Sequence, residues 1–325
     1  MPEDADTHPK IRKWIFVTGA PRSATTFVGQ ILSGRLEVDY IHEPFNPDCG
    51  IPGIDRRYLY FRSGSLEEQR YGPLVQSLFR YDVRLKTGYY ENDSRGRRLI
   101  KGVIGSRGPF FLRLARLNPF HTAAVIKDPI GCLLTEYLAE RFKVRPVIVV
   151  RHPVPFVAST MRLGWSLDLQ DLLGQPTLME DYFADDARMG TMLNGDRLAA
   201  AALFWRALNK VLLAQAARHP DWIVITHEAL NQDPVAAFRD LYVRLGLGWT
   251  ERIENRVRAR TGGHNKVDAG ELKVQNFNWN SAELFASRSR TLTPEQRGRI
   301  FDLTRDVALG LYDEASFGLG PATGS

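Results

Sequence analysis

The segment KWIFVTGAPRSATTFVGQIL, residues 13–32, decides the fold. Its first six residues are mostly apolar, which is typical of a buried strand, and residues 19–24 contain the glycine, proline and serine of a tight turn. Residues 25–32 then predict a helix that leaves the turn. The unpaired N–H groups and the partial positive charge at the start of such a helix attract an anion. The segment therefore predicts a phosphate-binding loop between a strand and a helix.

Outside this segment, short apolar runs alternate with longer amphipathic segments. Two of the runs, around Ile148 and Ile223, are continuously β-branched, as strands covered on both faces are. Strands are predicted at residues 14–17, 38–41, 123–126, 146–150 and 222–225. The alternation predicts an α/β fold, a three-layer sandwich with a central parallel sheet flanked by helices.

Three helices are indicated by patterns of their own. Apolar residues recur at helical spacing over residues 198–212. The pair Asp233-Pro234 has the form of an N-cap followed by a first-turn proline, with Gly246 as the stop. Residues 293–296, TPEQ, form a capping box that predicts a final helix running to about residue 312.

The composition predicts one domain over residues 13–313. Residues 1–12 and 314–325 have too little apolar content to fold, so both ends are predicted to be flexible. Residues 48–107 and 164–195 are irregular and rich in glycine, tyrosine and charge. We expect these two insertions to carry substrate recognition, because loops on a rigid scaffold usually do.

The charge of the chain is unevenly distributed. Lysine and arginine number 43 against 37 aspartates and glutamates, a net charge of +6, and residues 84–116 hold nine basic residues and two acidic ones. Such a segment either binds an anionic ligand or forms a solvated surface. No zinc-finger, RNP-like or basic-zipper pattern indicates binding to nucleic acid.

Membrane, export and metal signals are missing from the sequence. There is no run of about 18 apolar residues for a membrane span. The first six residues are acidic, whereas a signal peptide begins basic and then becomes apolar, and the two cysteines lack metal-ligand spacing. We therefore expect a cytoplasmic protein with reduced thiols and no membrane span.

The turn differs from the loop that binds nucleoside triphosphates. Aligning Gly19 with the first glycine of GxxxxGK[ST] places Ala24 on the second glycine and Thr25 on the lysine. The strongest later strand ends in Arg151 rather than in an aspartate that would hold magnesium. A kinase or NTPase is therefore disfavoured, and a plain turn is the other interpretation.

The turn resembles the PRSGTT loop with which sulfotransferases hold the 5′-phosphosulfate of 3′-phosphoadenosine 5′-phosphosulfate (PAPS). The resemblance implies a fold like that of P-loop-containing nucleotide hydrolases. As donor-binding residues it implies Gly19, Ala20, Pro21, Arg22, Ser23, Ala24, Thr25 and Thr26. Ala24 replaces the usual glycine, and its methyl group could crowd the anion or change the backbone.

A second motif follows the predicted strand 146–150. The same family has there an arginine and, eight residues later, a serine, both of which bind the 3′-phosphate of the nucleotide; Arg151 and Ser159 have this spacing. A guanidinium can give two parallel bonds to phosphate oxygens, and serine can add another. Alone, Arg151 could be a surface charge. Together with the first loop it favours a PAPS-dependent sulfotransferase, closest in style to bacterial or carbohydrate-type enzymes.

The resemblance also implies catalytic residues. Lys127 matches a lysine that contacts the transferring sulfonyl group, but Pro129 stands where cytosolic sulfotransferases have their catalytic histidine. In carbohydrate and protein-tyrosine sulfotransferases a glutamate after the second strand is the general base. Glu43 has that place, with His42 as the alternative. We expect partial burial to raise the pKa of Glu43. Arg22 and Lys127 would stabilise the sulfonyl oxygens, with no metal required.

The acceptor is less determined than the donor. Near the C-terminus, Trp279 and the cluster with Arg288 and Arg290 resemble the basic loop that closes over the 3′-phosphate. The aromatic side chains of the first insertion either stack on an acceptor or pack internally; they are Tyr58, Tyr60, Phe61, Tyr81, Tyr89 and Tyr90. The interpretation favours a hydroxyl on a glycan or glycoconjugate, with the oligomeric state open. The alternatives are a non-catalytic nucleotide-binding protein and an atypical P-loop kinase.

Overall fold

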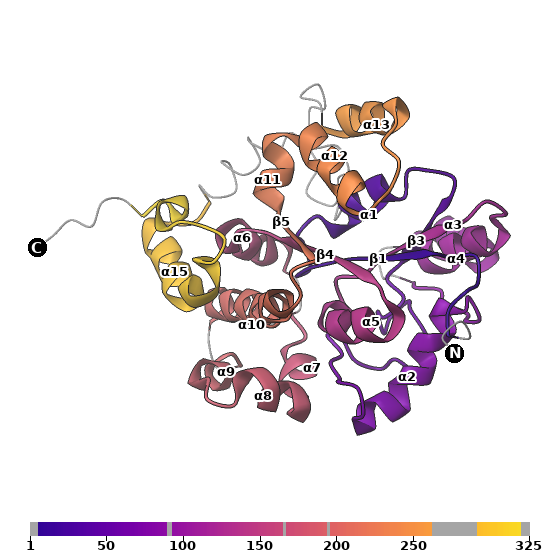
Figure 1. The fold of residues 1–325 in the computed structure, drawn as a ribbon. Helices are drawn as coiled ribbons and strands as arrows, with labels where there is room; N and C mark the ends of the chain where they lie inside the picture. Colours follow the sequence, from indigo (N-terminus) through magenta and orange to yellow (C-terminus); the bar gives the residue numbers. More distant parts are fainter. Residues whose placement is uncertain (1–5, 90–92, 165–166, 194–195, 262–290, 320–325) are drawn as a thin grey trace, which may run out of the picture.

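The computed structural model describes residues 6–89, 93–164, 167–193, 196–261 and 291–319 of the 325-residue chain. In this part, five parallel strands form one sheet in the order β2-β3-β1-β4-β5, with helices on both faces (Figure 1). The strands are β1 Lys13–Thr18, β2 Val38–His42, β3 Ala123–Lys127, β4 Arg145–Val150 and β5 Ile223–Thr226. All five predicted strands are confirmed within one residue at each end, and the three-layer α/β fold is confirmed with them.

The sheet is covered on both faces because its strands point alternate side chains in opposite directions. In β1, Trp14 and Phe16 face one core, whereas Ile15 and Val17 face another. The helices of the first core are α2 Leu66–Phe79, α4 Arg107–Leu117 and α5 Thr135–Phe142. Those of the second core are α1 Thr25–Leu32, α12 Pro234–Arg244 and α13 Glu251–Thr261.

A third core forms around α10 Arg197–Arg218, where the apolar stripe at 198–212 predicted a helix. The helices α6 Pro153–Leu163 and α15 Pro294–Ala308 pack against it. The predicted capping box at Thr293 is present, but α15 ends at Ala308 and not near residue 312. Gly246 has a φ of +61° just after α12, as expected for a helix stop. The short helix α11 His227–Gln232 follows β5.

The two predicted insertions are more regular than their composition suggested. The first contains α2 and α3 Arg95–Ile104, with α4 Arg107–Leu117 following; the second contains α7 Leu169–Leu173, α8 Pro176–Phe183 and α9 Ala187–Thr191. Gln175 joins them, because its side chain accepts from the N–H of Tyr60 at 2.8 Å and donates to the carbonyl of Tyr58 at 2.8 Å.

The aromatic side chains of the first insertion mostly pack internally. Tyr58, Tyr60, Phe61 and Tyr81 are buried, so an acceptor cannot stack on them, and that interpretation is wrong for these four residues. Tyr89 is exposed, and Tyr90 lies outside the described residues.

Both chain ends were predicted to be flexible, but their described parts, residues 6–12 and 314–319, make contacts with the rest of the fold. The N–H of His8 donates to the carbonyl of Phe79 at 2.7 Å, and Ile11 is buried. After α15, the 3-10 helix η2 Glu314–Phe317 buries Phe317 against Phe301, with ring centroids 5.0 Å apart. A single aromatic residue thus fixes a segment whose composition is otherwise polar. Of the helices in the described ranges, none is both long and apolar enough to cross a bilayer.

Candidate functional site

The sequence motifs all follow the carboxyl ends of adjacent strands. Parallel strands bring these ends to one edge of the sheet, where ligands of open α/β folds bind. In β3, Lys127 pairs in register with Val17 of β1 and with His42 of β2. The loop after β1, the pair His42-Glu43 after β2 and Arg151 after β4 therefore share that edge with Lys127. The fold brings together motifs that lie more than 100 residues apart.

The loop after β1 has the backbone of a tight anion-binding turn. Gly19 has a φ of +143°, and a Cβ there would lie 2.1 Å from the carbonyl oxygen of Val149, so no side chain fits. Ser23 donates its N–H to Ala20 at 3.2 Å, which closes the turn. Ala24 is the N-cap of α1 with φ 70° and ψ 16°, a left-handed conformation that favours glycine. This explains why the family loop usually has glycine at the position of Ala24. The left-handed conformation costs Ala24 about 1–2 kcal/mol of strain.

The second donor motif reaches this loop. Nη1 of Arg151 donates to the carbonyl oxygen of Arg22 at 3.1 Å. Arg151 is itself buried, and its own carbonyl accepts from Nε1 of Trp205 at 2.7 Å. The two motifs therefore contact each other in the fold.

Two hydroxyls of the donor motifs lack a hydrogen-bond partner among the described residues. Oγ of Ser23 in the loop and Oγ of Ser159 on α6 are buried and make no hydrogen bond to any described residue. An unsatisfied buried polar group costs about 1–3 kcal/mol. Both residues were predicted to bind phosphate groups, and a phosphate oxygen would satisfy each of them. The donor set of one guanidinium, two hydroxyls and a helix start therefore fits a phosphorylated nucleotide.

Glu43 forms an ion pair with Lys127. Nζ of Lys127, which is buried, lies 2.5 Å from Oε1 of Glu43, and Nδ2 of Asn46 donates to Oε2 at 3.0 Å. The N–H of Glu43 donates to the carbonyl of Lys127 at 2.8 Å, and its φ of 48° turns the chain at this point. Burial alone would raise the pKa of Glu43, but the charge of Lys127, the neighbouring His42 and the hydrogen bonds from Lys127 and Asn46 together outweigh burial and lower that pKa to about 2. The expectation of a raised pKa is wrong, because the sequence does not show this pairing.

His42 is neutral and already engaged. Burial and the charge of Lys127 lower its pKa to about 3. Its Nδ1 lies 3.1 Å from the hydroxyl of Tyr40, and its Nε2 lies 3.9 Å from Oε1 of Glu43. A hydrogen on Nε2 faces the carboxylate favourably, whereas a lone pair there would be repelled. Nδ1 then accepts from Tyr40, and the ring has no free lone pair.

Asp128 holds the segment that carries Glu43. Its Oδ2 accepts from the N–H of Phe45 at 2.6 Å, and its Oδ1 accepts from the N–H groups of Ile130 and Gly131 at 2.9 and 3.0 Å. Burial and the nearby charge of Glu43 raise the pKa of Asp128 to about 7. Asp128 has no role in the predictions made from the sequence. A buried aspartate directly after a strand was the signal for a residue that binds turn N–H groups.

Arg107 is a second residue that sequence reasoning did not single out. It opens α4, and a Cβ on the next residue, Gly108, would lie 3.3 Å from the carbonyl oxygen of His42. The positive charge of Arg107 is one cause of the lowered pKa of His42. The start of α4 therefore borders the site. The predicted loop with Trp279, Arg288 and Arg290 lies outside the described residues.

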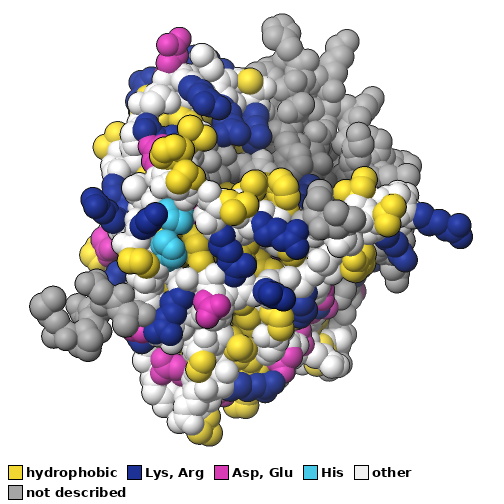
Figure 2. Space-filling view, turned by 90° about the vertical axis from the view of Figure 1, so that its right-hand side faces the viewer, with side chains coloured by type: hydrophobic (Ala, Val, Ile, Leu, Met, Phe, Trp, Pro, Cys, Tyr) yellow, Lys and Arg dark blue, Asp and Glu magenta, His cyan; other side chains and the backbone are white. Residues whose placement is uncertain are grey.

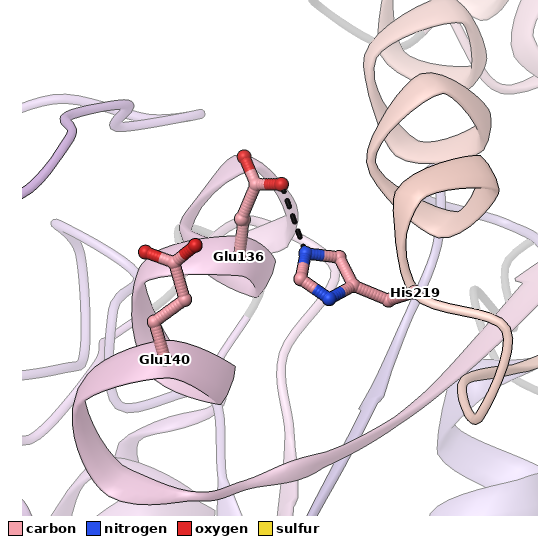
Figure 3. A group of neighbouring side chains, drawn as sticks. All are labelled: Glu136, Glu140 and His219. Atoms are coloured by element: carbon pink, nitrogen blue, oxygen red, sulfur yellow. Dashed lines mark hydrogen bonds and ion pairs between the residues drawn. The ribbon is translucent and has the colours of Figure 1, made fainter.

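A separate group of side chains has the composition of a metal site. Figure 3 shows Glu136 and Glu140 on α5 beside His219 at the end of α10, with ligand atoms all within 4.8 Å of one another. Nη2 of Arg218 lies 2.7 Å from each carboxylate oxygen of Glu136, and His219 stacks on Trp222 with centroids 4.5 Å apart. Since Arg218 already neutralises Glu136, we interpret this group as an ion-pair network and not as a metal site.

A comparison with models of protein families identifies the family of this chain. Residues 15–251 match the model of the "Sulfotransferase family". A search of the curated proteins found no match. Among solved structures, the chain is similar to the sulfotransferase domain from the curacin biosynthetic pathway (TM-score 0.47, 15% identity, 90% of this chain and 97% of that one). It is also similar to sulfotransferase STF9 from Mycobacterium avium (TM-score 0.44, 15% identity, 94% of this chain and 78% of that one).

Proposed function

Because the chain belongs to the sulfotransferase family, we propose that it transfers a sulfonyl group from PAPS to an acceptor hydroxyl. The observation that carries the proposal is the contact between the two donor motifs, in which Arg151 donates to the carbonyl of Arg22 at 3.1 Å. PAPS has a phosphosulfate at its 5′ end and a phosphate at its 3′ position, and it supplies the activated sulfonyl group. Two motifs that touch can bind both ends of one such nucleotide.

In the proposed donor site, one group of residues binds the 5′ end of the nucleotide and another group binds its 3′-phosphate. The loop 19–24 and the first N–H groups of α1 bind the 5′ end, with hydroxyls from Ser23, Thr25 and Thr26. Arg151 and Ser159 bind the 3′-phosphate, and the late basic residues Arg288 and Arg290 are proposed to close over it. Arg22 adds a positive charge near the sulfonyl oxygens, where charge develops as the bond to the leaving phosphate breaks.

Glu43 is the proposed general base. Its low pKa keeps it ionised at every physiological pH, so the carboxylate is ready to accept a proton from the acceptor hydroxyl. The geometry disfavours the alternative, His42, because one of its ring nitrogens faces Glu43 and the other faces Tyr40. His42 and Tyr40 are instead proposed to hold the carboxylate in place.

Lys127 connects the base to the reacting group. Its buried ammonium contacts Glu43 at 2.5 Å. When the ammonium group of Lys127 also interacts with the sulfonyl oxygens, its attraction to Glu43 weakens. The pKa of Glu43 then rises, and the carboxylate becomes a better proton acceptor. Lys127 thus couples stabilisation of the transferring group to activation of the acceptor. The proposed acceptor class is a glycan or glycoconjugate hydroxyl, which Arg107 at the edge of the site would help to hold if it is anionic.

The experiment that tests this function measures binding and transfer separately. Binding is followed as a thermal shift with adenosine 3′,5′-bisphosphate, the product of PAPS, and with ATP and magnesium. Transfer is followed by mass spectrometry with labelled PAPS and a panel of sugars, glycolipids and phenols. We expect a shift with the bisphosphate and sulfonation of at least one hydroxyl. A shift with ATP and magnesium alone would favour the atypical kinase, and binding without any transfer would favour the non-catalytic binding protein.

A matched pair of variants tests the base. Glu43→Gln is expected to bind the bisphosphate and to lose about 100- to 10,000-fold in turnover, as for removal of a general base. Glu180→Gln is the control, because Glu180 is exposed on α8 and pairs only across the surface with Arg62 at 3.3 Å. Near-normal turnover of Glu43→Gln would show that another residue is the base.

A further inference from the structure

The outer face of α4 is apolar. Phe110, Leu114 and Leu117 recur at helical spacing and are all exposed, and Phe120 follows at the end of the helix. Exposed fractions reach 78% for Leu117 and 67% for Phe120. The opposite face of α4, with Leu112 and Ala115, packs into the core over β2. Within the stripe, Phe110 packs edge-on against Phe111 with ring centroids 5.4 Å apart, whereas Leu117 is mostly exposed.

The neighbouring helix α3 presents the same kind of surface. Leu99 is 73% exposed, Ile100 is also exposed, and the two lie next to exposed Arg95 and Arg98. Gly88 joins the two helices, because its N–H donates to Oγ of Ser106 before α4 and its carbonyl accepts from Lys101 of α3, both at 3.0 Å. The two helices lie side by side at one end of the molecule (Figure 1), and we call the exposed surface of α3 and α4 the α3–α4 face.

Arginine side chains are interspersed with this apolar surface. Arg113 and Arg116 of α4 are exposed beside the stripe. Asp93, an acidic residue of the basic segment 84–116, is buried and forms an ion pair with Lys101. Figure 2, which faces this side of the molecule, shows basic side chains distributed among hydrophobic ones.

A cleft of about 480 Å³ lies along one side of α4. Its apolar residues are Val83, Leu85, Pro109 and Leu112, and its basic residues are Arg84, Arg113 and Arg116. Three guanidinium groups around an apolar floor suit a phosphate group attached to a hydrocarbon chain. Arg116 also donates to the carbonyl of Tyr81 at 2.8 Å, which fixes its position at the cleft.

We propose that the α3–α4 face docks on an anionic lipid bilayer, with its leucines and phenylalanines in the interface and its arginines on lipid phosphates. Interleaved leucine, phenylalanine and arginine on amphipathic helices is the pattern of a segment that lies in the membrane interface. The core of a protein interface, by contrast, is depleted of charge. Docking would bring the start of α4, and with it His42, next to the membrane. The inference stands apart from the proposed chemistry, because it concerns a surface outside the donor site.

The test is co-sedimentation of the full chain with vesicles. Vesicles of phosphatidylcholine alone are compared with vesicles that contain 30 mole per cent phosphatidylglycerol, about the level at which surface charge matters. We expect binding to the anionic vesicles, weaker binding to the neutral ones, and a loss of binding as salt rises. Absence of binding to the anionic vesicles at low salt would overturn the proposal.

Variants of the face make the test specific. Leu117→Ser and Leu99→Ser should each weaken vesicle binding about tenfold, and Arg98→Gln about fivefold. The controls are Val243→Ser, since Val243 is 69% exposed on α12, and Arg305→Gln on α15; both should bind as the unchanged chain does. Light scattering tests the alternative that a second copy of the chain covers this face. If Leu117→Ser dissociates a dimer and leaves vesicle binding unchanged, the face joins two copies of the chain and the proposal is wrong.

Discussion

The ion pair between Glu43 and Lys127 allows a stability prediction that does not depend on substrate. The pKa of Glu43 is lower in the fold than in a free carboxyl, so the ionised carboxylate stabilises the folded state at neutral pH. Since the folded pKa is the lower one, this contribution is present above pH 4.5 and is lost as pH falls toward 2. Glu43→Gln removes this carboxylate and leaves the buried charge of Lys127 unpaired, which costs about 3–5 kcal/mol in total.

The assay is urea unfolding at pH 7. Glu43→Gln is expected to lose about 3–5 kcal/mol of unfolding free energy. The double variant Glu43→Gln, Lys127→Met should recover most of that loss, because it removes both charges and keeps similar volumes. A loss below about 1 kcal/mol in the single variant, or a double variant less stable than the single one, would refute the assignment of a buried ion pair.

Three further predictions follow from backbone and packing. Ala24→Gly should raise the unfolding free energy by up to about 1 kcal/mol, because relief of left-handed strain exceeds the added entropy of the unfolded chain; a lower melting temperature would contradict this. Gly19→Ala should abolish the thermal shift with adenosine 3′,5′-bisphosphate. Gly190→Ala is the control and should retain that shift, because there is open space around Gly190. If both variants retain the shift, the loop can change its backbone to accommodate a methyl group at residue 19. Phe317→Ala should cost about 3–5 kcal/mol in urea unfolding, and an unchanged midpoint would mean that η2 adds nothing to the core.

The sheet could be predicted because its strands are short, continuous apolar runs. A run such as PVIVV at 146–150 carries its own signal, and β4 lies there at Arg145–Val150. The edge at which the motifs meet follows from parallel strands alone, so Lys127 and Arg151 were placed correctly without any contact being known. The short helices α7, α8 and α9 were missed, because a helix of five to eight residues has too few turns to show a period.

The electrostatics of the site could not be predicted from the sequence. Glu43 and Lys127 lie 84 positions apart, and only the fold shows that they contact each other. The roles of Tyr40 and Asp128 likewise depend on hydrogen bonds to the chain around Glu43, which no local pattern encodes. Phe317 shows the same limit in packing, since one buried ring in a polar segment outweighs the composition of its neighbours.

The most direct test of the account compares two ligands that differ only in the 3′-phosphate. Calorimetry would give the affinities of the unchanged chain, Ser159→Ala and Arg151→Ala for adenosine 3′,5′-bisphosphate and for adenosine 5′-phosphate. Loss of Arg151 is expected to weaken binding of the bisphosphate about 100-fold and loss of Ser159 about tenfold, while the monophosphate changes less than about threefold. Equal losses for the two ligands, or none for either, would contradict the claim that the strand end after β4 and the loop after β1 bind opposite ends of one nucleotide.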